Sequence, residues 1–305
     1  MSLLVVGSVA FDSVETPFGK REEALGGSAL FFSTAASFFT DVRLVAVVGQ
    51  DFPDEPVDFL RSRHVDISGL KPAPGKTFRW TGRYGFDLNE AVTLDTQLNV
   101  FGDFRPDLSE DYRDSEYVFL ANIDPELQLE VLEQVRNPKF VACDTMNFWI
   151  EGKLPELKKT LARGDMIVII EGEARALSGE SNIVKAARAI RALGPRYIVI
   201  KRGEYGALSF IGDDIFFAPA YPLEDVFDPT GAGDTFAGGM LGYLARCGEL
   251  GFSRMKLATV HGCVMASFVV ERFSFDAMRD LDDEKIARRL DAFRDLVTFD
   301  HLAEL

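Results

Sequence analysis

A short glycine-rich segment near residue 230 contains the residue types that phosphoryl-group chemistry requires. Its turn consists of Gly231, Ala232 and Gly233. Asp234 follows at once, and a pattern of helical spacing continues to about Gly248. Backbone N–H groups of such a turn can hold an anion, and the N-terminus of the following helix adds about half a positive charge. A carboxylate in that first turn can accept a proton from an attacking hydroxyl. The segment therefore predicts an anion hole beside a general base.

Glycine patterns in this chain also have competing interpretations. A dinucleotide fingerprint would need its third glycine two positions before Gly238 and a strand directly before the turn, where an Asp-Pro-Thr sequence stands instead. Residues 69–77 (GLKPAPGKT) nearly match a phosphate-binding loop, but the spacing is one residue too long, with two prolines and a strand pattern after it. A glycine turn that merely caps an ordinary helix, with Asp234 matched to the helix dipole, stays open on the local pattern.

The elements that would position this segment alternate along the chain. Short apolar runs typical of buried strands occur at residues 3–6, 44–48, 117–120, 166–170 and 197–200. Stretches of helical spacing lie between them, for example at 127–135 and 183–193. Alternating strands and helices predict βαβ crossovers and a mostly parallel sheet covered on both faces. The expected fold class is α/β.

One region departs from this alternation, because aromatic residues between 77 and 86 fall on even positions, the period of a strand with one apolar face. These aromatics are Phe78, Trp80, Tyr84 and Phe86. We expect residues 11–17 and 77–101 to form a small antiparallel sheet that projects from a main domain. The main domain would comprise residues 1–10, 18–76 and 102–305. The pattern leaves open whether the small sheet is a lid over a site or a packed edge or dimer contact.

Bulk properties exclude several classes of protein. A net charge of −15 argues against nucleic acid as a partner, because such binding needs clustered Lys and Arg. The same charge requires a phosphate site to act through local backbone dipoles and a metal ion. The first apolar run is too short for a secretory or membrane segment, so a cytoplasmic protein is expected. Cys143, Cys247 and Cys263 are widely spaced in apolar stretches and are expected to be buried rather than disulfide-bonded or metal-binding.

Four separated motifs together resemble one family, the ribokinase-like or pfkB-type carbohydrate kinases, which includes nucleoside kinases. The most specific is residues 228–236 (DPTGAGDTF), similar to the family's C-terminal signature. Residues 26–29 (GGSA) resemble its substrate motif, 48–51 (VGQD) the strand-end motif that follows, and 201–206 (KRGEYG) the turn before the nucleotide site. The resemblance implies a ribokinase-like α/β/α sandwich with a small β-sheet lid, and transfer of the γ-phosphate of MgATP to a hydroxymethyl group.

The resemblance also implies roles for individual residues. Asp234 would be the catalytic base, and the anion hole would be formed by the N–H groups of Gly231, Ala232 and Gly233. The small-molecule acceptor would bind at Asp12, Gly26, Gly27 and Ser28. Asp12 would hold a pair of sugar hydroxyls, since its two oxygens suit a vicinal diol. ATP would bind at Lys201, Gly203, Gly206, Thr230 and His261. Glu173 would orient Mg²⁺ through water.

Several of these residues also have plainer explanations. Asp12 would fit a turn at a strand end, Glu173 a surface acid, and His261 a packed residue on an apolar helix. Asp144 and Asn147 follow a predicted strand and could reach the metal and phosphate region or simply form a turn. His64 and His301 are expected at the surface.

The identity of the acceptor is left open by two departures from the family pattern. Ile170 stands where the family often has Asn before the metal glutamate, and Ser28 where many sugar kinases have Asn. A ribose-type acceptor is favoured, with a lean to a nucleoside, because Asp12 suits a diol and the aromatic strand could cover a nucleobase. The alternatives are another sugar kinase, of the fructose or sugar-acid type, and a non-catalytic sensor on the same fold.

Two further expectations concern binding partners. A phosphorylated sugar acceptor would need a basic cluster, for which Arg79 and Arg83 are the candidates. A homodimer through the small sheet is the partner that the dimer-contact alternative implies.

Overall fold

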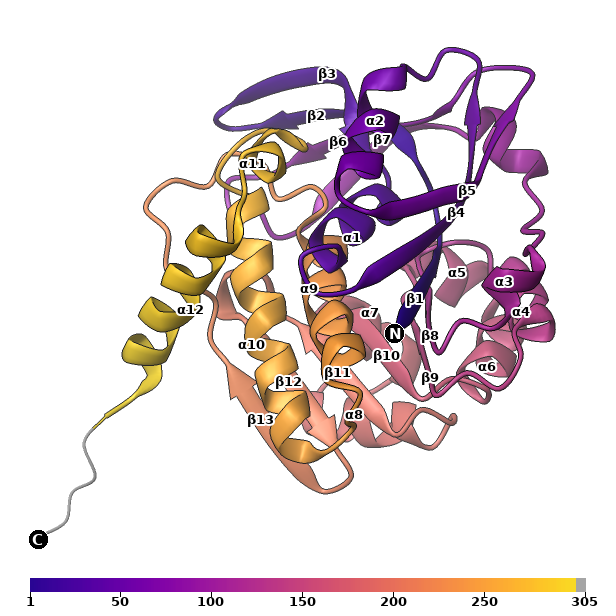
Figure 1. Ribbon diagram of the computed structural model, residues 1–305. Coiled ribbons are helices and arrows are strands. Elements are labelled where there is room, and N and C mark those ends of the chain that lie inside the picture. The colour runs from indigo at the N-terminus through magenta and orange to yellow at the C-terminus, as the bar shows by residue number, and fades with distance from the viewer. Residues whose placement is uncertain (300–305) are drawn as a thin grey trace, which may run out of the picture.

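A sheet of nine strands forms the centre of the computed structural model, which describes residues 1–299 (Figure 1). Its order is β13-β12-β11-β10-β9-β8-β1-β4-β5. The strands are β1 (Ser2–Val6), β4 (Asp41–Gly49), β5 (Val65–Ala73), β8 (Tyr117–Leu120), β9 (Phe140–Cys143), β10 (Met166–Ile170), β11 (Tyr197–Lys201), β12 (Ala207–Ile211) and β13 (Asp214–Ala218). The pairings from β5 to β11 are parallel, and those of β12 and β13 are antiparallel. All five apolar runs predicted as strands lie in this sheet.

Helices cover both faces of the sheet, because successive side chains of its strands point to opposite sides. Leu3 and Val5 of β1 belong to one buried cluster, whereas Leu4 and Val6 belong to the other. The first face is covered by α1 (Ser28–Ala36), α2 (Asp54–Ser62), α9 (Ala232–Cys247), α10 (Phe252–Val269), α11 (Asp276–Arg279) and α12 (Asp283–Val297). The second is covered by α3 (Glu110–Arg113), α4 (Pro125–Gln134), α5 (Asn147–Gly152), α6 (Leu154–Leu161), α7 (Glu171–Ser178) and α8 (Ile183–Arg191). Figure 1 shows this three-layer α/β/α arrangement.

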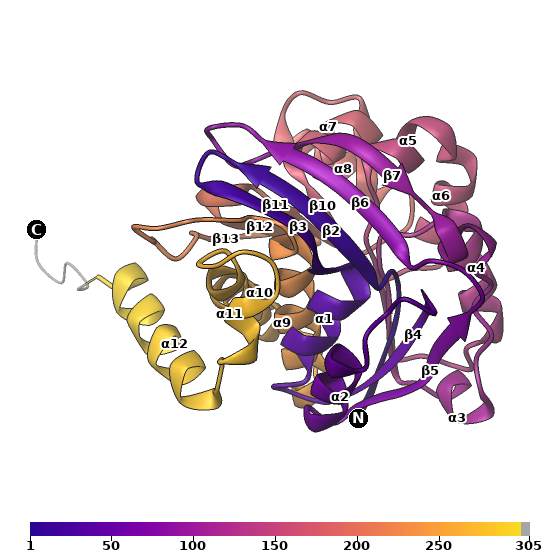
Figure 2. The same cartoon turned by 90° about the horizontal axis from the view of Figure 1, so that it is seen from above.

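A second, four-stranded sheet lies across one end of the main sheet (Figure 2). Its order is β3-β2-β6-β7, with β2 (Ala10–Thr16), β3 (Gly19–Gly26), β6 (Phe78–Tyr84) and β7 (Ala91–Gln97). We call these four strands the small sheet. It leaves the main body after β1 and after β5, and returns through a 3₁₀ turn at Asn99–Asp103.

The small sheet differs from its expected form in two ways. Residues 19–26, which we assigned to the main domain, form its outer strand β3; five of these residues are exposed, so the strand lacks the apolar alternation that would have revealed it. The sheet is also mixed rather than antiparallel, because β2 and β6 pair in parallel. Both strands continue from parallel strands of the main sheet, β1 and β5, and therefore start out in the same direction. Phe86 lies beyond the end of β6 and is 88% exposed.

Some expectations about single residues can be compared with the described chain. Cys143 and Cys263 are buried free thiols, as expected, and Cys247 is a partly buried one. His301 lies outside the described residues. Among residues 1–299, no helix combines the length and apolar character needed to span a membrane.

Candidate active site

The turn that begins α9 depends on glycine at its first position. Gly231 adopts a left-handed conformation, with φ of 76° and ψ of 0°. A Cβ atom there would lie 2.5 Å from the ring of Phe31, so both the conformation and the available space require glycine. Of the three N–H groups expected in the anion hole, that of Ala232 already donates to the carbonyl of Pro229 at 3.1 Å. The N–H groups of Gly231 and Gly233 are therefore the remaining candidates for an anion site at this turn.

Two carboxylates lie near this turn. Asp234, in the first turn of α9, is partly buried, and Asp12, on β2, is buried. Burial and the charge of Asp144 raise the pKa of Asp234 to about 7, against the opposing effect of Lys201. Burial also raises the pKa of Asp12 to about 7, with further contributions from the charges of Asp234 and Asp228. The charge of Asp234 acts on Asp12, so the expected base and the expected diol ligand lie near each other.

The glycine pair allows the carboxylate of Asp12 to lie against the backbone. A Cβ atom on Gly26 would be 1.9 Å from Oδ2 of Asp12, and Gly27 has a φ of 96°. The N–H of Gly27 donates to the same Oδ2 at 3.3 Å. The local sequence thus explains why two glycines stand here, and Asp12 is more than a turn residue. Ser28 follows this pair, and its hydroxyl accepts the N–H of Ser8 at 3.2 Å in the β1–β2 turn.

Lys201, the last residue of β11, reaches the opposite side of the same turn. A Cβ atom on Gly233 would lie 2.9 Å from its Nζ. The ammonium is 3.2 Å from Oδ2 of Asp144, and both side chains are nearly buried. Burial alone would lower the pKa of Lys201, but the nearby carboxylates, foremost Asp144 and then Glu173, outweigh it and raise that pKa. The ammonium therefore stays charged beside the proposed anion site.

Glu173 lies in the same cluster and is not a surface acid, because it is only 7% exposed. Burial raises its pKa to about 8, and the charge of Asp144 adds to the rise. Its Oε2 accepts the backbone N–H of Ile170 at 3.1 Å, which caps α7. The side chain of residue 170 is not needed for this hydrogen bond. Asn147, by contrast, is exposed at the start of α5.

The remaining residues predicted to bind ATP do not all lie together. Gly206 and Thr230 lie in turns near Lys201 and Asp234, whereas His261 lies within helix α10. The turn after β11 requires glycine at Gly206, where φ is 89° and a Cβ atom would lie 2.1 Å from a carbonyl oxygen. The backbone N–H of Thr230 donates to Oδ1 of Asp228 at 2.9 Å, which holds the segment before α9. His261 is not brought to the cluster. Its ring stacks on Tyr243 at 4.0 Å, which supports the packed-helix interpretation.

The structure adds residues that the sequence analysis did not assign to the site. Tyr84 of the small sheet comes within 3.5 Å of the hydroxyl of Thr230. The loop between β6 and β7 also reaches the nucleotide turn, because a Cβ atom on Gly203 would lie 2.1 Å from Oδ1 of Asn89. The even spacing of the aromatics was the signal in the sequence that could have identified Tyr84. The sequence contains no such signal for Asn89, which is an exposed loop residue.

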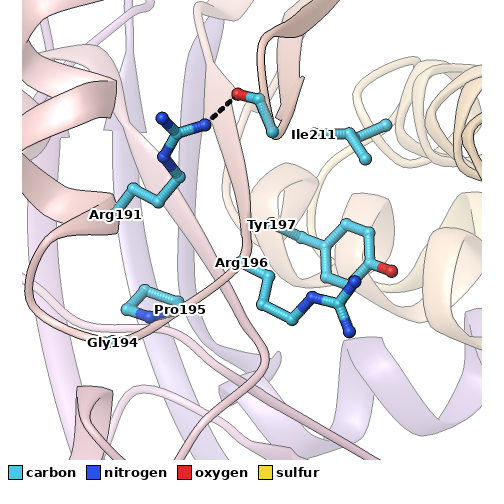
Figure 3. Close-up of a pocket in the computed structure, with 7 residues that line it drawn as sticks. Arg191, Gly194, Pro195, Arg196, Tyr197 and Ile211 are labelled. Atoms are coloured by element: carbon cyan, nitrogen blue, oxygen red, sulfur yellow. Dashed lines mark hydrogen bonds between the residues drawn. The ribbon is translucent and has the colours of Figure 1, made fainter.

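A separate pocket lies at the other end of the main sheet (Figure 3). It has a volume of about 200 Å³ and is lined by residues that include Arg191, Arg196 and Tyr197. Tyr197 begins β11, whereas Lys201 ends it, so the pocket is one strand length away from the cluster. In parallel sheets the ligand site lies at the carboxyl ends of the strands. This geometry favours the cluster around Asp234 as the active site.

Comparison with known proteins identifies the family of this chain. The sequence pattern of the pfkB family carbohydrate kinases matches residues 4–278. A cytidine kinase of Thermococcus kodakarensis is 33% identical over 271 residues, which are 84% of this chain and 95% of that protein. The nucleoside kinase of Methanocaldococcus jannaschii has a similar structure, with a TM-score of 0.75, 19% identity, and coverage of 95% of this chain and 98% of that one. A ribokinase II structure from E. coli in complex with ATP and Mg²⁺ has a TM-score of 0.77, 18% identity, and coverage of 95% and 99%.

Proposed function

Since the chain belongs to the pfkB family of carbohydrate kinases and is an ATP-dependent sugar or nucleoside kinase, we propose that its acceptor is a nucleoside. The phosphoryl group would be transferred to the hydroxymethyl oxygen of the ribose. The observation that carries this proposal is the pair of Asp12 on the small sheet and Asp234 at the start of α9, each with a raised pKa and the first raised in part by the charge of the second. One carboxylate can hold the ribose diol while the other faces the hydroxymethyl group. The small sheet is then a lid over the acceptor.

The state of two arginines supports an acceptor without a phosphate of its own. Arg79 forms ion pairs at 2.8 Å with Asp51 and with Glu23. Arg83 is 3.1 Å from Glu15. Both candidate cations are thus already neutralised by carboxylates, and a phosphorylated sugar would have to displace them. The similarity to a protein named cytidine kinase, over 84% of this chain, points to a nucleoside as well.

In the proposed mechanism the chain supplies a base and a site for negative charge. Asp234 accepts the proton of the hydroxymethyl group as its oxygen attacks the γ-phosphate in line. The N–H groups of Gly231 and Gly233 face the phosphoryl oxygens, together with the positive end of α9. The ammonium of Lys201, beside Gly233, adds a full positive charge to that site. Burial strengthens these interactions because little water screens them.

The residues present also fit a magnesium ion bound with ATP. Asp144 and Glu173 are buried, and their charges and that of Asp234 all act on the ammonium of Lys201, so three carboxyl groups gather around one cation. Within residues 1–299, no group of three or more side chains would hold a metal ion by itself. Mg²⁺ typically keeps several waters and binds through one or two carboxylates plus the substrate phosphates. We propose that Glu173 and Asp144 hold its water shell; when bound, the ion neutralises charge on the phosphates.

A panel of acceptors tests the proposed function. We expect ADP formation with cytidine, inosine or adenosine to exceed that with ribose, fructose or fructose phosphates. A preference for fructose or a sugar acid would contradict the nucleoside assignment and leave the kinase assignment intact. Nucleotide binding without ADP release for any acceptor would favour the sensor instead.

The diol contact of Asp12 gives a sharper test. In the wild-type enzyme, a nucleoside that lacks one hydroxyl of the diol should lose about 10- to 100-fold in kcat/KM, because a hydrogen bond to a charged group is worth about 1.5–3 kcal/mol. In Asp12→Asn, kcat/KM for the ribonucleoside should fall by a similar factor. Removing the diol hydroxyl from the substrate should then lower kcat/KM of this variant little further. Equal discrimination by both enzymes would show that Asp12 does not contact the diol.

The pH dependence of kcat/KM should follow the ionisation of Asp234, the proposed base. Because Asp234 must be deprotonated to accept a proton, and burial and Asp144 raise its pKa to about 7, kcat/KM should rise with pH and be half-maximal near pH 7. Asp144→Asn removes a negative neighbour and should move the profile to lower pH. A pH-independent kcat/KM between pH 5.5 and pH 8 would contradict the assigned base.

The cellular location and the oligomeric state of the enzyme are predictions. We propose a cytoplasmic enzyme that forms a homodimer through the small sheet and does not bind nucleic acid. Light scattering of the wild-type protein, and of a variant with a charge in place of exposed Val92 or Leu94 on β7, tests the dimer.

A further inference from the structure

Asp51, which lies just after β4, joins the main domain to the small sheet. Its Oδ1 accepts both the backbone N–H and the hydroxyl of Thr77, each at 2.7 Å. The same hydroxyl accepts the N–H of Gly49, the last residue of β4, at 3.0 Å. Thr77 is fully buried and directly precedes β6. The end of β4 is therefore fastened to the point where the chain enters the small sheet for the second time.

The other carboxylate oxygen of Asp51 reaches into the small sheet itself. Its Oδ2 is 2.8 Å from Nη2 of Arg79, and Nη1 of the same guanidinium donates to the carbonyl of Thr77 at 3.0 Å. Asn99, where the chain returns to the main domain, donates to that carbonyl at 2.9 Å. Burial alone would raise the pKa of Asp51, but the hydrogen bonds from Thr77 and Arg79 outweigh it and lower that pKa. A charged carboxylate thus stands at the junction of the two sheets.

Arg79 and Phe52 together hold the back of strand β2. In the pairing of β2 with β6, Arg79 lies opposite Phe11. The guanidinium carbon is 5.0 Å from the centre of the Phe11 ring, and the centre of the Phe52 ring is 5.6 Å from it. Because successive side chains of a strand point to opposite faces, Asp12 points the other way, where Gly27 donates to its carboxylate. The contacts of Phe11 therefore fix the strand that carries Asp12.

We propose that Asp51 is a positioning residue for acceptor binding, which through Arg79 and Phe11 sets the place of Asp12 in the active site. Arg79 has a second ion pair, with Glu23, but that residue belongs to β3 of the small sheet. Of the two pairs, the one with Asp51 ties the guanidinium to the main domain. A shift of β2 would weaken the contact of Asp12 with the acceptor and leave the proposed ATP residues on β11 and α9 in place.

The inference rests on the proposed function, in which Asp12 holds the ribose diol, and Asp51→Asn tests it directly. Asparagine keeps the size and an oxygen for Thr77 but removes the charge that pairs with Arg79. We expect KM for the nucleoside to rise about 3- to 30-fold, the range typical of residues that act through a network, with kcat and KM for ATP within about twofold.

Glu15→Gln is the matched control. Glu15 forms an ion pair with Arg83 at 3.1 Å, between the same two strands β2 and β6, but both residues lie within the small sheet. The control variant loses a carboxylate charge of the same kind without cutting a link to the main domain. Its kinetic constants should equal those of the wild type.

A double-mutant cycle shows whether the effect passes through Asp12. In an Asp12→Asn background, adding Asp51→Asn should raise KM for the nucleoside little further, because the contact that Asp51 positions is already lost. A second pair of variants tests the inference if Asp51→Asn folds poorly. Thr77→Val removes the hydroxyl between Asp51 and Gly49 and should act like Asp51→Asn, whereas Thr77→Ser keeps that hydroxyl and should resemble the wild type.

Three outcomes would overturn the inference. A wild-type KM in Asp51→Asn would show that Asp51 does not position the acceptor site. An equal rise in KM for ATP and for the nucleoside would show that it supports the whole domain. An undiminished rise in the Asp12→Asn background would show that the effect bypasses Asp12. Failure of the proposed function looks different, because the wild-type enzyme would then phosphorylate a sugar and not a nucleoside. The same cycle, run with that sugar, then decides the role of Asp51.

Discussion

Asp234→Asn is expected to lower kcat by at least about 10²–10⁴-fold, the usual contribution of a positioned base. Asparagine has nearly the same shape as aspartate but cannot accept the proton of the attacking hydroxyl. The measurement is the rate of ADP formation at saturating ATP and acceptor. Asp295→Asn on α12 serves as the control, because its side chain is 76% exposed and far along the chain from the site. Near-normal turnover of Asp234→Asn would remove Asp234 from the mechanism.

The same substitution should not destabilise the protein. The pKa of Asp234 in the folded protein is raised to about 7 from its ordinary value near 4, chiefly by burial. A carboxyl with a raised pKa contributes stability at low pH and loses it as the pH rises towards 7. Asparagine carries no such dependence, so the Tm of Asp234→Asn relative to the wild type should increase between pH 4 and pH 7. A lower Tm at pH 8 would mean that the carboxylate is held by favourable contacts.

Lys201→Met is expected to have the second large effect, a fall in kcat of about 10²–10³-fold, as for the loss of one preorganised donor to developing charge. It should also destabilise the protein by about 3–5 kcal/mol, because Asp144 would lose its buried partner. Lys139→Met is the control, since that lysine forms an ion pair on the surface, 2.6 Å from Glu116. Urea unfolding and steady-state kinetics measure the two effects.

A charge-balanced double variant separates catalysis from stability. Lys201→Met combined with Asp144→Asn removes both members of the buried pair, which lie 3.2 Å apart. Much of the lost stability should return, because no charge is left without its partner. Turnover should stay low, since the phosphoryl oxygens still lack the ammonium. Recovery of kcat together with stability would assign Lys201 a purely structural role.

Much of the main domain could be predicted from local sequence. The apolar runs at 166–170 and 197–200 are strands because their side chains are buried on both faces of a parallel sheet. The small sheet was predicted less well. Strand β3 has mainly charged, exposed residues, and its place depends on hydrogen bonds to β2 rather than on its own pattern. The parallel pairing of β2 and β6 was also not predictable, because pairing direction depends on where the chain leaves the main sheet.

The candidate site shows the same division between local and long-range information. The turn at Gly231 could be recognised because its conformation is a property of adjacent residues. The sequence left His261 with two interpretations, a nucleotide-binding residue by family resemblance or a packed residue on an apolar helix, and its ring stacks on Tyr243. The role of a side chain on a long helix depends on which face it occupies, and the motif order does not contain that information.

The sequence by itself determined the glycine turn, the carboxylate at the start of α9 and the family to which they belong. These features are local, because a left-handed glycine and a helix N-terminus need only a few consecutive residues. Only the tertiary structure decided that Asp12, Asp144 and Lys201 surround that turn, and that Tyr84 enters the site from the lid. Burial and the charge of Asp144 raise the pKa of Asp234 to about 7 against the opposing effect of Lys201. These effects exist only once distant strands end at the same edge of the sheet.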